Sequence, residues 1–231
     1  MANAAPPQLL TVGTDRSAIR AREDYVKAIY QIGGGAPVRA AEVARYLNVS
    51  RVSVSKAKRL LESQGLLEIQ ASSSAPMQLT ARGRKLAVAM VRRHRILETF
   101  LHESLRVPLD RIHSEAERIE HVISDGIALR IAAMLGHPRH DPHGHPIPYG
   151  DAPAPARPLP SLAGLAAGEK ARVLSLDDRD DRAVASLARD GILPGSTLRV
   201  ERNDRGAVRV RVGKRAVALT PKLAELVRVE R

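Results

Sequence analysis

Apolar side chains recur at helical spacing in the first third of the chain and predict three helices, over 17–32, 40–47 and 51–64. Three consecutive glycines end the first helix, and the hydroxyl of Ser50 can cap the third. Only a tight turn separates the second helix from the third. Two helices joined so closely are typical of a helix-turn-helix.

Two short apolar runs, 66–69 and 77–80, flank a polar loop and predict a β-hairpin. A hairpin directly after a helix-turn-helix is the wing of a winged-helix domain. Beyond it, apolar stripes predict two longer helices, one over 81–104 with Thr80 as its cap and one over 114–135. These two helices predict a second, helical domain.

The last third of the chain changes from helical to alternating spacing. Eight of the 15 prolines lie in 138–160, which predicts a stiff linker. Five short β-like runs follow and predict a small SH3-like β-barrel. The fold class is therefore mainly α with small β parts. We divide the chain into a disordered tail over 1–16, a winged-helix domain over 17–87, a helical domain over 88–148, a Pro-rich linker over 149–160 and an SH3-like domain over 161–231.

Composition removes several classes of function. The chain of 231 residues has no cysteine, which excludes disulfides, thiolate metal sites and cysteine nucleophiles. No apolar run reaches about 18 residues, and the N-terminus lacks the pattern of a signal peptide. We therefore expect a cytoplasmic protein with no membrane partner. One Phe, four Tyr and no Trp argue against binding of single-stranded nucleic acid, whose bases usually stack on aromatic rings.

Charge is unevenly distributed along the chain, whose formal net charge is +12. Residues 36–93 hold 11 basic and 3 acidic side chains, whereas residues 94–145 hold 6 basic and 8 acidic side chains and all 8 histidines. This order is typical of a polyanion-binding module joined to a metal-binding one. The alternative is that the charges only solvate the surface.

The helix predicted over 51–64 has the features of a DNA-reading helix. Val54, Ala57 and Leu61 can face the core, which turns the opposite face toward the major groove. Lys58 is one candidate for a phosphate contact. The main candidate DNA contacts are Arg39, Ser50, Arg51, Val52, Ser53, Ser55, Lys56 and Arg59. Winged helices also mediate protein contacts, which is the alternative function of this domain.

Histidines and carboxylates gather at helical spacing in the second domain. Four of these residues follow the spacing i, i+4, i+7 and i+8 on one predicted helix: His113, Glu117, Glu120 and His121. Two more, His94 and Glu98, lie on the preceding helix at i and i+4. Mixed imidazole and carboxylate ligands suit a divalent ion such as Mn²⁺, Fe²⁺ or Zn²⁺. The alternatives are structural: Glu117 could close a capping box with Ser114, and the other glutamates could be solvated charges.

Motifs of metalloenzymes and nucleotide-binding enzymes are missing from the sequence. HExxH is absent, and the inverted HxxEH motif and the ExxH pair of di-iron bundles both fail at Arg118. No Walker loop, GxGxxG after a strand, or GxSxG is present. We therefore expect a protein that is not an enzyme.

Six segments carry a resemblance to a known family: EDYVKAIY (23–30), SRVSVSKAKRLLESQGLL (50–67), MQLTARGRKLA (77–87), RRHRILETFL (92–101), HSEAERIEHVISD (113–125) and DPHGHPIP (141–148). With them the chain resembles the diphtheria-toxin-repressor family of metal-dependent transcriptional regulators, as a three-domain member similar to its manganese-sensing branch. The resemblance implies a winged-helix domain that binds DNA, a helical domain that dimerises and holds metal, and an SH3-like domain.

The resemblance also implies two metal positions. The primary position draws on Asp24, Glu117, Glu120 and His121. The ancillary position draws on His94, Glu98 and His113. An acid of the third domain joins them, and of Asp177, Asp178, Asp180 and Asp181 we take Asp180. As in streptococcal-type manganese sensors, the linker residues Asp141 and His143 contribute as well.

The metal preference follows from departures within this family resemblance. Asp24 and Glu117 stand where the family's iron sensors have Met and Cys, and harder oxygen ligands favour Mn²⁺ as the activator. Fe²⁺ is the alternative, and Zn²⁺ or Co²⁺ can substitute in vitro. Lys27 stands where two-domain manganese regulators carry a Glu, which argues against a binuclear site of that type.

The resemblance implies a homodimer that binds a palindromic double-stranded DNA operator when loaded with metal and controls metal-transport genes, with no small organic substrate. We expect the metal to clamp Asp24 to the ligands of the helical domain and so to set the spacing of two recognition helices. The alternatives are an Fe²⁺-dependent repressor of the same fold, a metal-dependent hydrolase or oxidase, and a protein-interaction adaptor.

Overall fold

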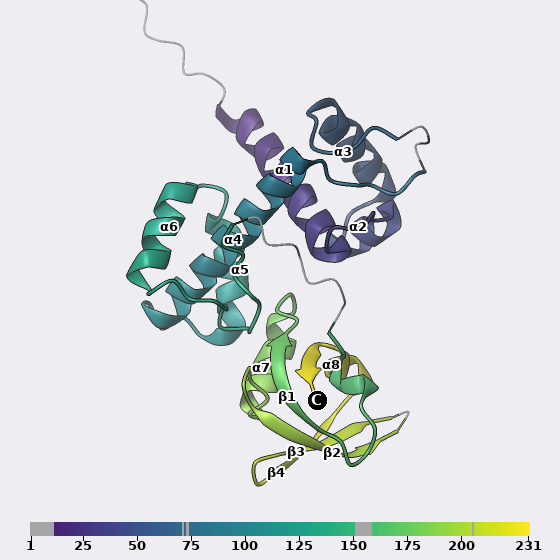
Figure 1. The fold of residues 1–231 in the computed structure, drawn as a ribbon, viewed down its shortest axis with the longest axis vertical. Coiled ribbons are helices and arrows are strands. Elements are labelled where there is room, and N and C mark those ends of the chain that lie inside the picture. Colours follow the sequence, from purple (N-terminus) through teal and green to yellow (C-terminus); the bar gives the residue numbers. More distant parts are fainter. Residues whose placement is uncertain (1–11, 71, 73, 151–158, 205) are drawn as a thin grey trace, which may run out of the picture. The chain divides into compact units, whose positions relative to one another are not determined.

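The computed structural model describes residues 12–70, 72, 74–150, 159–204 and 206–231 (Figure 1). The chain divides into two compact units, Met1–Met90 and Val91–Arg231. Among the described residues, no helix combines the length and apolar character needed to cross a membrane.

The first helix begins earlier than the sequence predicted. Helix α1 spans Val12–Gly33, so the predicted disordered tail over 1–16 is wrong for 12–16, and 1–11 lie outside the described residues. Gly13 is the one residue in 12–16 that strongly disfavours a helix, at a cost of about 1 kcal/mol relative to Ala. The remaining residues let the helix extend toward the N-terminus.

Helices α2 (Ala40–Tyr46) and α3 (Arg51–Ser63) lie where the apolar spacing predicted them. Asn48 takes a positive φ of 52° and makes the tight turn between them. The Ser50 hydroxyl accepts a hydrogen bond from the Ser53 amide at 3.0 Å, which confirms the predicted cap.

The predicted hairpin is present as isolated antiparallel bridges rather than as two regular strands. Leu67 pairs with Leu79, and Met77 pairs with Val38 from the segment before α2. Leu67, Met77 and Val38 are all buried, so the wing is held to the helices mainly by its apolar side chains.

Helix α4 (Ala81–Glu103) starts in the first unit and continues into the second. The Gly83 amide donates to the Thr80 hydroxyl at 3.0 Å, which confirms Thr80 as the cap of this helix. In the second unit, α4 is followed by α5 (Leu109–Ile119) and α6 (Asp125–Met134).

The single helix predicted over 114–135 is therefore wrong. The Ser124 hydroxyl accepts a hydrogen bond from the Ile127 amide at 3.3 Å and starts α6 as a new helix, because a serine side chain can replace the backbone acceptor at a helix start. Ser114 lies inside α5, which begins after Pro108, so the alternative capping box with Glu117 does not form.

Part of the predicted linker packs tightly instead of spanning a gap. Ile147 joins a buried apolar cluster with Ile96, and the backbone of 138–149 folds against the helical part of the unit. Gly144 has a φ of +89°, and a Cβ there would lie 2.0 Å from the Leu174 carbonyl oxygen, so only glycine fits. The prediction of a stiff linker over 138–160 is thus wrong for 138–149, and 151–158 lie outside the described residues.

The C-terminal part is a five-stranded antiparallel sheet with strand order β4-β3-β2-β1-β5 (Figure 1). The strands are β1 (Lys170–Leu176), β2 (Thr197–Asn203), β3 (Val208–Val212), β4 (Arg215–Leu219) and β5 (Val227–Glu230). The five predicted β-like runs are confirmed. Three short elements were not predicted from the sequence, the 3₁₀ helix η1 (Leu162–Gly164) and the helices α7 (Asp181–Arg189) and α8 (Pro221–Glu225).

Candidate metal centre

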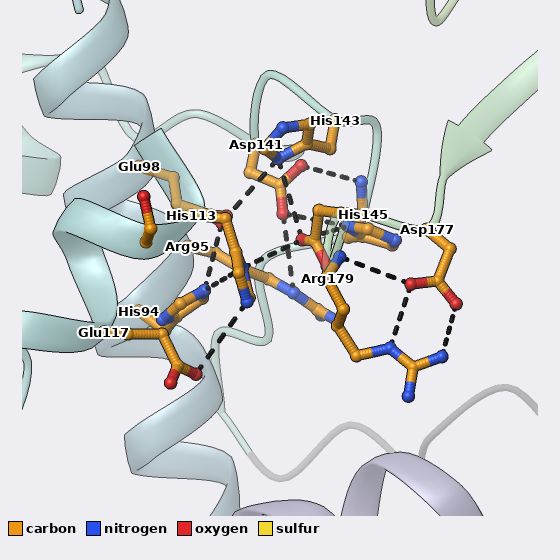
Figure 2. Close-up of polar contacts among 12 residues, drawn as sticks. His94, Arg95, Glu98, His113, Glu117, Asp141, His143, His145, Asp177 and Arg179 are labelled. Carbon is orange, nitrogen blue, oxygen red and sulfur yellow. Dashed lines mark hydrogen bonds and ion pairs between the residues drawn. The ribbon is translucent and has the colours of Figure 1, made fainter. Parts of the chain in front are cut away.

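Two helices and two loops of the second unit bring imidazoles and carboxylates together: α4, α5, the packed loop over 138–149, and the loop between β1 and α7 (Figure 2). Helix α7 lies against α5, which places the start of the SH3-like domain beside the helical domain. The hydrogen bond from the Leu176 amide to the His143 carbonyl, at 2.9 Å, joins the packed loop to β1.

The centre of the cluster is formed by three donor atoms on α4 and α5. Nε2 of His94 lies 3.0 Å from Oε1 of Glu98 and 3.1 Å from Nδ1 of His113, and the last two atoms are 3.1 Å apart. Neighbouring ligand atoms around a cation with bonds of about 2.1 Å are separated by about 3.0–3.4 Å. The three atoms therefore have the spacing of a partly assembled coordination shell.

Asp178 and His143 complete the set from the other side. Oδ2 of Asp178 lies 3.5 Å from Nδ1 of His113 and 3.6 Å from Nδ1 of His143, which is also 3.7 Å from Oε1 of Glu98. Nε2 of His143 lies 3.0 Å from the Leu109 carbonyl, to which it can donate its proton. That bond favours the tautomer whose Nδ1 carries a lone pair toward the cluster.

The acid of the third domain at this cluster is Asp178, not the expected Asp180. The Asp180 carboxylate caps α7 by accepting hydrogen bonds from the Arg182 and Ala183 amides, both at 3.1 Å. Asp177 is held by Arg179, with oxygen to nitrogen distances of 2.9 and 2.6 Å.

Asp141, which the resemblance implied as a ligand, is buried next to the cluster. A carboxylate oxygen of Asp141, one of Glu98 and a ring nitrogen of His143 all lie within 4.8 Å of one another. Two cations face the same carboxylate: Nε of Arg95 lies 3.6 Å and Nδ1 of His145 lies 3.4 Å from its Oδ2. His145 and Arg95 were not among the residues predicted for the site. The first lies in the segment DPHGHPIP, so its position in the loop was the signal that could have found it.

Glu117 lies on α5, whereas Glu120 and His121 lie in the turn directly after it, so the single helical face that the sequence predicted ends at Ile119. Glu120 is fully buried, with Oε2 2.7 Å from Nδ1 of His94 and Oε1 3.4 Å from Nε2 of His121. Glu117 is half-exposed, with Oε1 3.9 Å from Nε2 of His113. Asp24 belongs to α1 in the first unit, so its predicted place among these ligands stays a prediction.

Burial and opposite charges shift the proton affinities of the cluster. Burial alone would raise the pKa of Glu98, but the charge of His94 and a hydrogen bond with His113 hold it well below its usual range. Burial alone would lower the pKa of His113, but Asp178 and Glu98 raise it to about 11. The pKa of His143 rises to about 9 because the Glu98 and Asp178 carboxylates outweigh the same effect of burial. In the metal-free protein, protons on imidazoles therefore balance the buried carboxylates.

Unsatisfied buried atoms show that this donor set fits a divalent cation. Oε2 of Glu98, Oδ2 of Asp141 and Nδ1 of His143 are buried and make no hydrogen bond within the described part of the chain. Buried polar atoms normally have a hydrogen-bond partner, and all three atoms can ligate a metal; Oδ2 of Asp141 has ion-pair partners, Arg95 and His145. The residues best placed to hold the ion, with nitrogen and oxygen donors only, are His94, Glu98, His113, His143 and Asp178.

The predicted DNA-reading face of α3 is exposed. Val52 is 64% exposed while Val54 and Leu61 are buried, so the predicted inward and outward faces are confirmed for these residues. Ser53, Lys56 and the other outward candidates on α3 are exposed as well. Lys58 is not available to phosphate, because it is buried and its Nζ donates to the Ala75 carbonyl at 3.0 Å.

Comparisons with known proteins agree with this arrangement of domains. Family models match in three places: "Iron dependent repressor, N-terminal DNA binding domain" over 19–75, "Iron dependent repressor, metal binding and dimerisation domain" over 80–149, and "FeoA domain" over 161–231. The iron-dependent repressor IdeR of Mycobacterium tuberculosis is 32% identical over 224 residues, which cover 90% of this chain and 96% of that protein. The diphtheria toxin repressor of Corynebacterium glutamicum is 31% identical over 222 residues, which cover 90% and 95%.

Solved structures of manganese regulators are also similar to most of this chain. A manganese-dependent transcriptional repressor in complex with manganese is 35% identical, with a TM-score of 0.80 over 90% of this chain and 98% of that chain. The manganese regulator SloR is 27% identical, with a TM-score of 0.72 over 91% and 98%. Iron and manganese thus both appear among the names of the similar proteins.

Proposed function

The chain belongs to the diphtheria-toxin-repressor family, whose members are metal-dependent transcriptional repressors rather than enzymes, and on that premise we propose that Mn²⁺ is the ion that activates it. The family places a DNA-binding domain, a dimerisation domain and an SH3-like domain in one chain, so duplex DNA and a second copy of the chain are its partners.

The observation that carries the proposal is the convergence of His94 Nε2, Glu98 Oε1, His113 Nδ1 and Asp178 Oδ2 within 4.8 Å of one another. These residues come from α4, α5 and the loop before α7. Oxygen and imidazole donors suit Mn²⁺, and sulfur donors are excluded because the chain has no cysteine and no methionine lies in the cluster. Fe²⁺ is the alternative ion, since iron-dependent repressors are among the relatives.

We expect metal binding to activate the protein by changing the balance of charge among the ligand residues. When bound, the cation would replace the positive charge that imidazole protons supply in the metal-free cluster, and it would attract carboxylates from several elements at once. Glu98 and Asp178 would then hold α4 and the start of the SH3-like domain together, and His113 and His143 would give up their protons. At the predicted primary position, an ion held by Asp24, Glu117, Glu120 and His121 would link α1 to the helical domain and so would fix the separation of the two α3 helices in a dimer.

The finer expectations follow from the same switch. A homodimer presents two identical reading helices, so its operator is a palindrome with half-sites about one helical turn, or a multiple of it, apart. The regulated genes are those of metal transport, and the protein acts in the cytoplasm. Metal and DNA bind with positive and reciprocal coupling of about 1–3 kcal/mol.

Selection of duplexes from a random 40-bp library, followed by titration with each ion, tests the proposal. The Mn²⁺-loaded protein should enrich an inverted repeat, and Mn²⁺ should tighten binding to it about 5- to 150-fold over chelated protein at fixed salt. Anaerobic Fe²⁺ and Zn²⁺ are the comparison ions. Affinity that is the same with Mn²⁺ and with chelator would contradict the proposal, and activation by Fe²⁺ alone would replace Mn²⁺ with the iron alternative.

A further inference from the structure

The outer face of the SH3-like sheet carries basic residues at positions directly opposite one another on neighbouring strands. Lys170 on β1 pairs with Arg199 on β2, and Arg199 pairs in turn with Arg211 on β3. Arg202 on β2 pairs with Arg209 on β3. We call these five residues, Lys170, Arg199, Arg202, Arg209 and Arg211, the basic face.

The strand pattern places all members of the basic face on the solvent side. Along β3, Val208 and Val210 are buried and the two arginines between and after them are exposed. Along β2, Leu198 and Val200 are buried on either side of Arg199. Because residues directly opposite in an antiparallel pair share a face, the cross-strand partners form one continuous exposed surface.

The basic face lowers the stability of the sheet, and the fold does not require basic residues at these positions. Like charges directly opposite each other destabilise a sheet. Glu201 offsets Arg211, at 2.6 Å, and Asp204 offsets Arg202, also at 2.6 Å. The side chains of the other three members, Lys170, Arg199 and Arg209, make no hydrogen bond or ion pair within the part of the chain that the structure describes.

The charges of this domain are also unevenly distributed along its sequence. Residues 197–219, which form β2 to β4, hold seven basic and two acidic side chains. Residues 177–190, which hold Asp178 and form α7, contain five acidic and three basic side chains. Basic residues are therefore concentrated in the segment of the strands β2 to β4, and acidic residues in the segment that supplies the metal ligand; Arg215 and Asp190 form an ion pair between the two segments, at 3.7 Å.

We propose that the basic face binds the phosphate backbone of duplex DNA and adds a second DNA contact to the one made by α3. Arginine is preferred for phosphate because its guanidinium presents several donors in a fixed plane, and four of the five members are arginines. The exposed neighbours on these strands include Thr197, Ala216 and Ala218, with no aromatic or large apolar anchor of the kind that membrane-surface binders use. The inference rests on the proposed function for its partner, duplex DNA.

The test compares two double variants of the full-length chain that lose the same charge. Arg199→Gln/Arg209→Gln removes two unpaired members of the basic face. Arg182→Gln/Lys222→Gln removes two cations on α7 and α8 and serves as the control. The probe is a 40-bp duplex of random sequence, titrated by fluorescence anisotropy between about 50 and 200 mM NaCl, with Mn²⁺ and with chelator.

The basic-face variant should bind the duplex at least about fivefold more weakly than the control, and its plot of log affinity against log salt should be less steep by about two. Its metal-free thermal midpoint should equal or exceed that of wild type, because like charges have been removed. Equal DNA affinities and salt slopes of the two variants would overturn the proposal, as would a wild-type protein that does not bind the duplex.

Vesicles of phosphatidylglycerol and phosphatidylcholine in equal parts provide the second arm. Retention by vesicles that the basic-face variant loses, together with an unchanged DNA slope, would overturn the proposal in favour of a lipid surface. The comparison of wild-type DNA affinity with Mn²⁺ and with chelator does not depend on the outcome of the vesicle experiment. Loss of metal dependence in wild type counts against the proposed function, whereas the difference between the two variants tests only the basic face.

Discussion

Nδ1 of His94 lies 2.7 Å from Oε2 of Glu120, while Nε2 of the same ring lies 3.0 Å from Oε1 of Glu98. One imidazole therefore joins a residue predicted for the primary metal position to the ancillary cluster. Both glutamates are fully buried, so the ring is held at both ends. A histidine that ligates a metal through one nitrogen usually donates its other N–H to such an acceptor, which fixes the tautomer and raises its basicity.

Replacing Glu120 by Gln should weaken Mn²⁺ binding at the ancillary cluster about 10- to 100-fold, because His94 loses its carboxylate acceptor. Calorimetric titration on an Asp24→Ala background isolates that cluster from the predicted primary position. Glu115→Gln makes the same chemical change on α5 at a residue paired only with Arg118 among the contacts described, and it should leave the affinity unchanged. Equal affinities of the two variants would show that the His94–Glu120 contact has no influence on the metal.

Asp178→Asn and Asp180→Asn form a matched pair in one loop. Asp178→Asn should lower Mn²⁺ affinity at the cluster by at least about tenfold, because an anionic donor becomes neutral. Asp180→Asn should change neither affinity nor stability, since Asn caps a helix about as well as Asp. The reverse order of effects in a calorimetric titration would return the ligand role to Asp180.

Manganese binding should release protons and become tighter as the pH rises from about 6 to 9. His113 and His143, with pKa values of about 11 and about 9, are protonated in the metal-free protein at pH 7.5, whereas ligation needs neutral imidazoles. Calorimetry at pH 7.5 in two buffers of different ionisation enthalpy should detect about one to two protons released per ion. A binding enthalpy independent of the buffer would contradict these assignments.

The same raised pKa values predict how the stability of the metal-free protein depends on pH. A histidine whose pKa is higher in the folded state than the ordinary 6.5 stabilises the fold fully below pH 6.5. That contribution should be lost as the pH rises through about 9 toward about 11. Chemical denaturation of the protein in the presence of chelator, between pH 6 and pH 10, measures this trend. A free energy of unfolding that rises over this range would contradict the assignment.

Two lysines on α3, Lys56 and Lys58, should respond differently to alanine. Lys56 is exposed, so Lys56→Ala should weaken DNA binding and reduce the salt slope by about one, with a change in unfolding free energy within about 0.5 kcal/mol. Lys58→Ala should destabilise the domain by about 1–3 kcal/mol, because the Ala75 carbonyl loses its buried donor. Anisotropy and urea denaturation separate the two effects, and a stability loss at Lys56 would count against its outward position.

Asp24→Ala should remove most of the Mn²⁺ dependence of DNA binding while the protein keeps its fold. The proposed clamp needs a carboxylate on α1 to meet the ligands of the second unit. Arg20→Ala removes the cation that lies 3.9 Å from Asp24 but keeps the carboxylate, so it should retain metal activation. A wild-type response to Mn²⁺ in the Asp24 variant would remove the clamp from the mechanism.

The sequence predicted the helices and strands where periodicity and capping agree. Ser50 and Thr80 start α3 and α4 as predicted, and the alternating apolar positions predict all five strands. The break between α5 and α6 was missed because Ile119, Ile123 and Ile127 continue one apolar stripe across it. The periodicity of side chains does not report that the backbone changes direction at Ser124.

The metal centre was predicted on its helices and less well in its loops. Helical spacing is enough to place His94 beside Glu98, because residues four apart share a face. No such rule applies between β1 and α7, where Asp178 points into the cluster and Asp180 turns back to cap a helix. The packed loop was predicted to be a linker because it is rich in proline. The burial of Asp141 and His143 depends on contacts distant in sequence, which composition does not report.

Crystals of the full chain grown or soaked with Mn²⁺, with data collected at the manganese absorption edge, test the central claim most directly. We expect an anomalous peak in contact with His94 Nε2, Glu98 Oε1, His113 Nδ1 and Asp178 Oδ2. A fully occupied manganese position elsewhere, with these four side chains still bonded only to one another, would contradict the claim.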